Sequence, residues 1–279
     1  MANGVTIPFA DGHIRQLPVI SEGPFEYSNY AVEYLLAAKA VSGPDSKIKQ
    51  AVISASAMSL LYPPEPITNY SREQFIEDVV RCAVKDIRQC LDEGADSVQV
   101  DFTEGRLSLK LDPSGGLLQQ FLDLNERVFS AFSADELQRI GIHVCPGADA
   151  DSTHSADILY TSLLSPLLKT LSCGRFFLQM KSEANPDEAL SAVREHLRPH
   201  QKIYVGVTDV NTPIVESAEE VCACIEHAAK FIPLSQLGVC DDCGFSPFAD
   251  DVSTGREIAF AKIRARVEGT ALASKKLFA

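Results

Sequence analysis

Positive charge is scarce in this sequence. Its 279 residues include 25 Lys and Arg against 38 Asp and Glu, which gives a formal net charge of −13 at pH 7. A surface of that sign repels phosphate backbones and anionic lipid, so the composition argues against nucleic acid or a membrane surface as a partner. The sequence also lacks any apolar run close to the roughly 20 residues that a membrane span needs.

The first residues lack the basic start and the apolar core of a secretory signal. Eight cysteines in a chain of this length are too sparse for the disulfide framework of a small secreted protein. We therefore expect reduced thiols, some of them available to a metal, and a cytoplasmic protein. No linker-like tract and no repeat divides the sequence, which predicts one domain over residues 1–279 and leaves the oligomeric state open.

Short apolar runs alternate with longer amphipathic segments, a pattern typical of β/α units around a parallel sheet. Strands are expected at residues 17–20, 51–55, 97–101, 140–145, 175–180, 203–208 and 236–240, with residues 6–9 as a candidate eighth. Helices are expected at residues 30–41, 72–93, 117–132, 155–171, 186–197, 218–231 and 256–274. The pattern favours an α/β fold, a (β/α)8 TIM barrel of about 250 residues, with a doubly wound open sheet as the alternative.

Polar and thiol side chains stand at the carboxyl ends of successive expected strands, where the active sites of parallel barrels gather. His143 and Cys145 are two residues apart, so on a strand both side chains point to the same face. Cys243 follows the last expected strand and is the natural third ligand. One imidazole and two thiolates suit a tetrahedral zinc site.

Three blocks of residues occur in a specific order along the chain. They are Gly141-Ile142-His143-Val144-Cys145, residues 205–217 (VGVTDVNTPIVES) and Asp242-Cys243-Gly244-Phe245. In order and spacing they resemble the zinc-binding C-terminal barrel of the cobalamin-independent methionine synthase family. The resemblance extends from about residue 41 to the C-terminus and includes the strand-end segments 53–64 and 98–106.

This resemblance implies a zinc-dependent transferase within a single TIM barrel. In the family, Zn2+ activates a thiol substrate as a zinc thiolate, and a methyl or alkyl group is then transferred to the sulfur. The family default converts homocysteine to methionine with a folate as methyl donor. A free thiol has a pKa of about 8.5, and coordination supplies a thiolate that stays nucleophilic. The implied partners are a small-molecule thiol and an alkyl donor.

The resemblance places three of the family's zinc ligands on His143, Cys145 and Cys243. The family's fourth ligand is a glutamate at the end of the fifth strand. Matching residue by residue puts Gln179 there, and Glu183, four residues on, is the alternative. Cys240 offers another solution, because with Cys243 it forms a Cys-x-x-Cys pair. A site of Cys240 and the three other ligands would be closed and structural.

Three residues take catalytic roles from the same resemblance. Asp101 ends a strand where the family has an aspartate that contacts the substrate ammonium group. Asp209 also matches a family aspartate. Asn211 stands where the family has a histidine proton donor, and an asparagine cannot deliver a proton at neutral pH. This departure favours an electrophile other than a methylated folate.

Substrate contacts are further expected from Arg106, Ser54 and Tyr62. Arg106 either pairs with Glu104 or binds a substrate carboxylate, and Ser54 and Tyr62 lie in the segment 53–64. The family stacks a tryptophan against the folate ring, whereas this sequence has no tryptophan and has Tyr62 near that place. Two other functions stay open. One is a zinc-dependent lyase or hydrolase in which the metal activates water or polarises a carbonyl, and the other is a barrel with only a structural zinc.

Overall fold

Six parallel strands form the centre of the protein, for which a computed structural model describes residues 4–279. The strands are β3 (Lys49–Ile53), β4 (Ser97–Asp101), β5 (Ile140–Val144), β8 (Arg175–Leu178), β9 (Lys202–Gly206) and β10 (Leu237–Cys240). They pair in the order β10-β9-β8-β5-β4-β3, so each strand lies next to one that is close in sequence. This is the arrangement that repeated right-handed β/α units produce.

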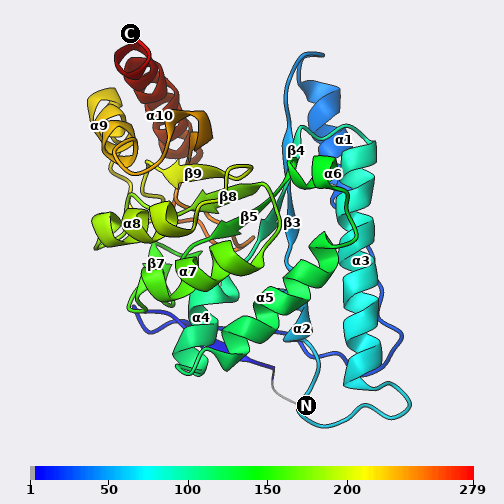
Figure 1. Ribbon diagram of the computed structural model, residues 1–279. Coiled ribbons are helices and arrows are strands. Elements are labelled where there is room, and N and C mark those ends of the chain that lie inside the picture. The colour runs from blue at the N-terminus through cyan, green and yellow to red at the C-terminus, as the bar shows by residue number, and fades with distance from the viewer. Residues whose placement is uncertain (1–3) are drawn as a thin grey trace.

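Helices cover the outer face of the sheet, as Figure 1 shows. The helices are α1 (Val32–Val41), α2 (Ala55–Ser59), α3 (Arg72–Asp92), α4 (Glu104–Leu111), α5 (Gly116–Phe129), α6 (Ala134–Leu137), α7 (Tyr160–Thr170), α8 (Pro186–His196), α9 (Ala218–Ala228) and α10 (Arg256–Leu277). A short 3-10 helix covers Leu234–Gln236. The helices pack in sequence order around the sheet, with contacts from α1 to α3, α3 to α5, α5 to α7 and α7 to α8.

The expected α/β architecture with a parallel sheet is confirmed. All seven expected helices are present, and six of the seven expected strands pair in the sheet. The strand expected at residues 17–20 is wrong. Pro18 lacks a backbone N–H and cannot serve a central strand, and the Ile20 N–H donates instead to the carbonyl of Leu61 in a loop.

Two small antiparallel hairpins stand apart from the main sheet. β1 (Thr6–Pro8) pairs with β2 (Ile14–Gln16), so the segment 6–9 is extended as expected but does not join the parallel sheet. The second hairpin joins β6 (Ala148–Asp149) to β7 (Ser152–Thr153) in the loop after β5. Within residues 4–279, the strand pairings leave β3 and β10 as the two edges of the sheet. Its inner face therefore stays open between these edges.

Aromatic rings and glycines alternate on this inner face. Phe177 and Tyr204 stack with ring centroids 4.7 Å apart. Glycines on the neighbouring strands leave room for them, because a Cβ at Gly141 would lie 2.7 Å from the Phe177 ring and one at Gly238 would lie 2.4 Å from the Tyr204 ring. The stack forms a floor across the middle of the sheet. In the same row of the sheet, the register aligns Asp101 with His143 and His143 with Phe177.

The β6–β7 hairpin carries a buried histidine that makes stability depend on pH. Nδ1 of His154 lies 2.7 Å from Ser155 Oγ, and the ring contacts Phe9 edge-on. Burial lowers the pKa of His154 to about 4; the charge of Lys110 acts in the same direction, and Asp157 opposes it. In the unfolded chain the imidazole of this histidine has its ordinary pKa of about 6.5. The resulting stability is complete above that value and is lost as the pH falls toward 4.

We expect this histidine to lower the free energy of unfolding by about 2 kcal/mol at pH 5 relative to pH 8. Urea unfolding of the wild type and of His154→Gln at both pH values measures the effect, because glutamine does not titrate. The same substitution at the exposed His200 serves as the control. An equal pH dependence in the wild type and in His154→Gln would contradict this assignment.

Candidate metal centre

A group of one imidazole and two thiols lies at the carboxyl end of the sheet. His143 is in β5, Cys145 directly follows that strand, and Cys243 comes from the loop after β10. Their ligand atoms all lie within 4.8 Å of one another, and the two sulfur atoms are 3.3 Å apart. His143 and Cys145 are buried, while Cys243 is only half-buried. The structure thus brings together the three candidate ligands that the sequence predicts, and His143 and Cys243 line a cavity.

Asp242 holds the Cys243 loop over the end of β8. Its carboxylate accepts hydrogen bonds from the backbone N–H groups of Met180 (2.8 Å), Lys181 (2.8 Å) and Ser182 (2.7 Å), and from Ser182 Oγ (2.7 Å). Gly206 makes this approach possible, because a Cβ there would lie 1.9 Å from Asp242 Oδ1. The residue before a candidate ligand therefore ties two strand-end loops together. The sequence pattern around Asp242 does not predict these contacts.

The three side chains fit a zinc ion. Nε2 of His143 is buried without a hydrogen-bond partner among the residues that the structure describes. The contact with Cys145 holds the pKa of Cys243 well below its ordinary value, with His143 acting in the same direction. The same contact and burial raise the pKa of Cys145. The free group thus resembles one thiolate that shares a proton with a second thiol. A pair of sulfur donors with one imidazole nitrogen is a donor set that zinc prefers.

Gln179 and Glu183, the two candidates for a fourth ligand, are both in contact with Arg106. Arg106 Nη2 donates to Glu183 Oε2 at 2.6 Å, and its Nη1 lies 3.5 Å from Gln179 Oε1. Gln179 Nε2 donates to Ser182 Oγ at 2.9 Å. The Arg106 side chain is buried, and its guanidinium stacks 4.1 Å from the centre of the Tyr160 ring. The ion-pair partner of Arg106 is thus Glu183, and not Glu104, which was one of the two alternatives from the sequence.

The closed set of ligands is not formed. Cys240 is the last residue of β10, and its thiol donates to the carbonyl oxygen of Tyr204 at 3.4 Å. The group of three His, Cys or acidic residues does not include Cys240. Because β10 ends at Cys240, Cys243 lies three residues beyond the strand, in the loop at the carboxyl end of the sheet, while Cys240 stays in the sheet.

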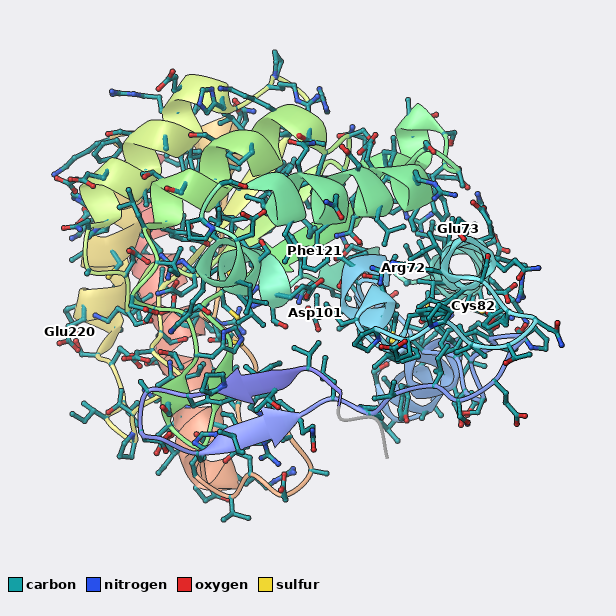
Figure 2. The ribbon with its side chains drawn as sticks, turned by 90° about the horizontal axis from the view of Figure 1, so that it is seen from below. Arg72, Glu73, Cys82, Asp101, Phe121 and Glu220 are labelled. Carbon is teal, nitrogen blue, oxygen red and sulfur yellow. The ribbon has the colours of Figure 1, made fainter. Side chains whose placement is uncertain are left out.

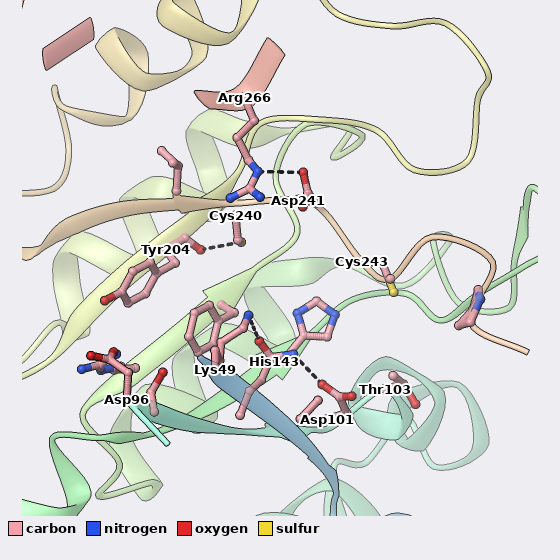
Figure 3. A pocket seen from close by; sticks show the side chains of 18 residues that line it. Lys49, Asp96, Asp101, Thr103, His143, Tyr204, Cys240, Asp241, Cys243 and Arg266 are labelled. Carbon is pink, nitrogen blue, oxygen red and sulfur yellow. Dashed lines mark hydrogen bonds and ion pairs between the residues drawn. The ribbon is translucent and has the colours of Figure 1, made fainter. Parts of the chain in front are cut away.

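Asp101 shares a cavity with the metal-ligand group. The cavity has a volume of about 640 Å3, and His143, Cys243 and Asp101 all line it (Figure 3). Burial raises the pKa of Asp101, and His143 opposes the shift. Seen from below in Figure 2, Asp101 lies near the centre of the molecule, whereas Glu73 and Glu220 lie at its periphery. Asp101 therefore faces the same cavity as the candidate ligands His143 and Cys243.

Ser54 and Tyr62 lie among buried residues. Ser54 caps α2, where its hydroxyl accepts the Ala57 N–H and donates to Glu104 Oε1 at 2.6 Å. The Tyr62 hydroxyl donates to the carbonyl of Tyr70 at 2.7 Å. Neither residue lines the cavity of the metal-ligand group or the second cavity described next. The structure does not bring these two predicted contacts to the metal-ligand group.

Asp209 and Asn211 line a second cavity of about 350 Å3, together with Gln179 and Arg106. The turn after β9 fixes them, because Asp209 Oδ1 accepts the Asn211 N–H at 2.9 Å. The Asp209 N–H in turn donates to Glu216 Oε1 at 2.7 Å. One cavity is thus lined by the candidate metal ligands His143 and Cys243, and the other by Asp209 and Asn211.

Comparison with known proteins decides the family. Residues 18–268 match the family model described as the cobalamin-independent synthase, catalytic domain. The chain belongs to this family. The resemblance read from the three sequence blocks is therefore confirmed. The cobalamin-independent synthase fold is also evident in a B12-independent methionine synthase from Shewanella sp. W3-18-1, solved in complex with selenomethionine. It superimposes with a TM-score of 0.73 and 20% identity over 99% of this chain and 75% of that one.

Two relatives with similar sequences are named for different reactions. A 2-hydroxypropyl-CoM lyase from Xanthobacter autotrophicus is 31% identical over 112 residues, which are 40% of this chain and 26% of the lyase. A 5-methyltetrahydropteroyltriglutamate–homocysteine methyltransferase from Aliivibrio fischeri is 26% identical over 185 residues, which are 66% of this chain and 21% of that enzyme. The matched part of this cobalamin-independent synthase domain thus spans about a fifth to a quarter of these relatives. No helix of residues 4–279 is long and apolar enough to span a bilayer.

Proposed function

We propose that this chain binds one zinc ion through His143, Cys145 and Cys243 and transfers an alkyl group to the sulfur of a small thiol. The observation that carries the proposal is the tight group of two sulfurs and an imidazole, whose candidate fourth ligands are engaged by Arg106. Three protein ligands with a further coordination position are typical of catalytic zinc sites, whereas structural sites are closed. Methyl transfer to homocysteine is the family default.

A zinc ion at this position would supply the Lewis acidity that lowers the pKa of a substrate thiol from its free value of about 8.5. Asp101 faces the same cavity and is proposed to accept the ammonium group of an amino acid thiol. Its Oδ1 is held by Gln99 Nε2 at 2.6 Å, which orients the carboxylate without neutralising it. Binding in this cavity thus brings the sulfur beside Cys243, the half-buried ligand.

The alkyl donor is proposed to bind in the second cavity, against Asp209 and Asn211. The thiol sulfur forms a bond to the alkyl carbon while the bond from that carbon to the leaving group breaks. The leaving group then needs a proton. The Asn211 amide can donate a hydrogen bond to it but cannot release a proton, so the proton comes from water or from the donor itself. This requirement favours a donor whose leaving group is less basic than a folate amine.

A second candidate rests on the 31% identity with the 2-hydroxypropyl-CoM lyase. In that case the same metal and thiol chemistry makes or breaks a carbon–sulfur bond in another small molecule. Product analysis with alkyl donors of both kinds separates the two candidates, because only a transferase consumes a methyl donor.

The test is zinc X-ray absorption on the purified chain with and without homocysteine. We expect one zinc per chain, bound by two sulfur atoms, and a third sulfur atom when the thiol is added. A zinc shell with three or more protein sulfur atoms that ignores added thiols would identify a structural site instead. A chain that takes up no zinc after refolding with excess metal would overturn the proposal.

A further inference from the structure

The cavity of the metal-ligand group contains one cation without an anionic partner. Three basic side chains of the lysine and arginine type line this cavity: Lys49, Arg175 and Arg266. Burial lowers the pKa of Lys49, and the charges of Cys240 and Asp101 oppose that shift. Arg266 Nε lies 3.0 Å from Asp241 Oδ1, and Arg175 Nη1 lies 3.5 Å from Asp96 Oδ2. Lys49 forms no ion pair with any carboxylate of residues 4–279; its Nζ donates to the neutral amide oxygen of Gln99. The positive charge of Lys49 is thus available to a ligand.

The surroundings of Lys49 direct this charge into the cavity. Lys49 begins β3, an edge strand of the sheet, and is exposed on the open inner face. Its Nζ lies 4.2 Å from the centre of the Phe177 ring, and Phe177 is the register partner of His143 on the neighbouring strand. Figure 3 shows Lys49 and His143 among the residues that line this cavity. An anion bound at Lys49 would therefore lie close to the Phe177 ring, in the cavity that His143 and Cys243 also line.

Gln99 forms hydrogen bonds to both Lys49 and Asp101 in this cavity. Its amide oxygen accepts from Lys49, and its amide nitrogen donates to Asp101 Oδ1 at 2.6 Å. Gln99 thus bridges Lys49 and Asp101, which form no direct ion pair with each other within residues 4–279. Each of them can then form a charge-assisted hydrogen bond with a ligand, which is about twice as strong as a neutral one.

We propose that Lys49 binds the anionic end, a carboxylate or a sulfonate, of the small thiol whose sulfur reaches the metal-ligand group. The inference deepens the proposed function and rests on it for the role of the sulfur. It makes Lys49 a specificity-determining residue: small anionic thiols are selected over neutral thiols of the same length. Carboxylate and sulfonate share the chemistry that Lys49 recognises, and the choice between them is left to the experiment.

The first experiment uses metal-free protein and ligands without sulfur nucleophiles, so that it does not depend on zinc. Ligand-observed NMR titrations compare butyrate with butyramide and ethanesulfonate with ethanesulfonamide. We expect the wild type to bind the anion of at least one pair more tightly than its amide, by about tenfold. Lys49→Met is expected to abolish this selectivity, and Lys49→Arg to retain it. Equal binding of anion and amide by the wild type, or unchanged selectivity in Lys49→Met, would overturn the inference.

The second experiment uses zinc-loaded protein with homocysteine, 2-mercaptoethanesulfonate and the neutral 2-mercaptoethanol. Lys49→Met should raise the Kd of the preferred anionic thiol about tenfold or more, with less than about a twofold change for 2-mercaptoethanol. The preferred anion identifies carboxylate or sulfonate as the natural group. Lys47→Met is the matched control, since Lys47 is exposed two residues earlier and does not line the cavity. An equal loss for all three thiols would contradict a charge-specific role.

If zinc fails to bind but the anion selectivity of the metal-free protein depends on Lys49, the proposed zinc-dependent function is wrong and the anion site at Lys49 is still supported. If zinc and thiols bind but Lys49→Met changes nothing, the proposed function stands and this inference falls. The two proposals are therefore tested separately.

Discussion

Replacing Cys243 by serine is expected to abolish stoichiometric zinc binding and, with it, activity toward thiols. Cys243 supplies one of only two sulfur donors, and its sulfur lies 3.3 Å from that of Cys145. Outer-shell partners of metal ligands already change metal affinity about 10- to 100-fold. Loss of a thiolate ligand should exceed that range. Metal analysis after dialysis and competition with a chelator of known affinity measure the effect.

Two further cysteine variants make this result specific. Cys224 lies in α9 outside the metal-ligand group, so Cys224→Ser should keep one zinc per chain. Cys240→Ala should also keep it, because the Cys240 thiol donates to the Tyr204 carbonyl. Loss of zinc in Cys240→Ala would show that the site is closed and structural. Retention of tight zinc binding in Cys243→Ser would exclude this cysteine as a ligand.

Replacing Lys262 by methionine is expected to lower the free energy of unfolding by about 3–5 kcal/mol. The Lys262 side chain is fully buried, and its Nζ lies 3.1 Å from Glu216 Oε2. It also donates to the carbonyl oxygen of Ile214. Without the lysine, the carboxylate of Glu216 stays buried with no cation beside it. Urea unfolding at pH 7 measures the loss.

An ion pair of the same length on the surface provides the matched control. Lys276 Nζ also lies 3.1 Å from a glutamate, Glu226, but 59% of the Lys276 side chain is exposed. Lys276→Met should therefore cost no more than about 1 kcal/mol. Equal losses in the two variants would show that burial does not govern the energy of the Lys262 pair. Adding Glu216→Gln to Lys262→Met should recover part of the loss.

The helices and the six sheet strands could be predicted because each has a local signal. In α3, buried Phe75, Val79 and Ala83 recur at four-residue steps, and the hydrophobic period alone identifies the helix. Residues 104–111 lack such a signal. This segment forms the short helix α4 because Glu104 is held by Ser54 and Ser56, 50 and 48 residues away in the sequence. Contacts over that distance leave no periodic pattern.

The candidate ligands were predictable for a related reason. His143 and Cys145 lie on one strand, so their common face follows from their spacing. The partners of Gln179 do not, because Arg106 and Ser182 reach it from other segments. Lys49 was missed altogether. A single lysine at the start of an edge strand reads as a solvated surface charge, and only the open inner face of the sheet distinguishes it.

The hydrogen bonds of Asp242 have a consequence for motion. The Asp242 carboxylate accepts hydrogen bonds from three consecutive backbone amides, those of residues 180–182. The residue that follows Asp242 in the sequence is Cys243. The Cys243 loop and the β8 loop must therefore move together. A displacement of the Cys243 sulfur is therefore expected to shift Gln179 and Ser182, which line the second cavity. We therefore expect a ligand at Cys243 to change the protection of the amides of residues 180–182, which amide hydrogen exchange with and without zinc would measure.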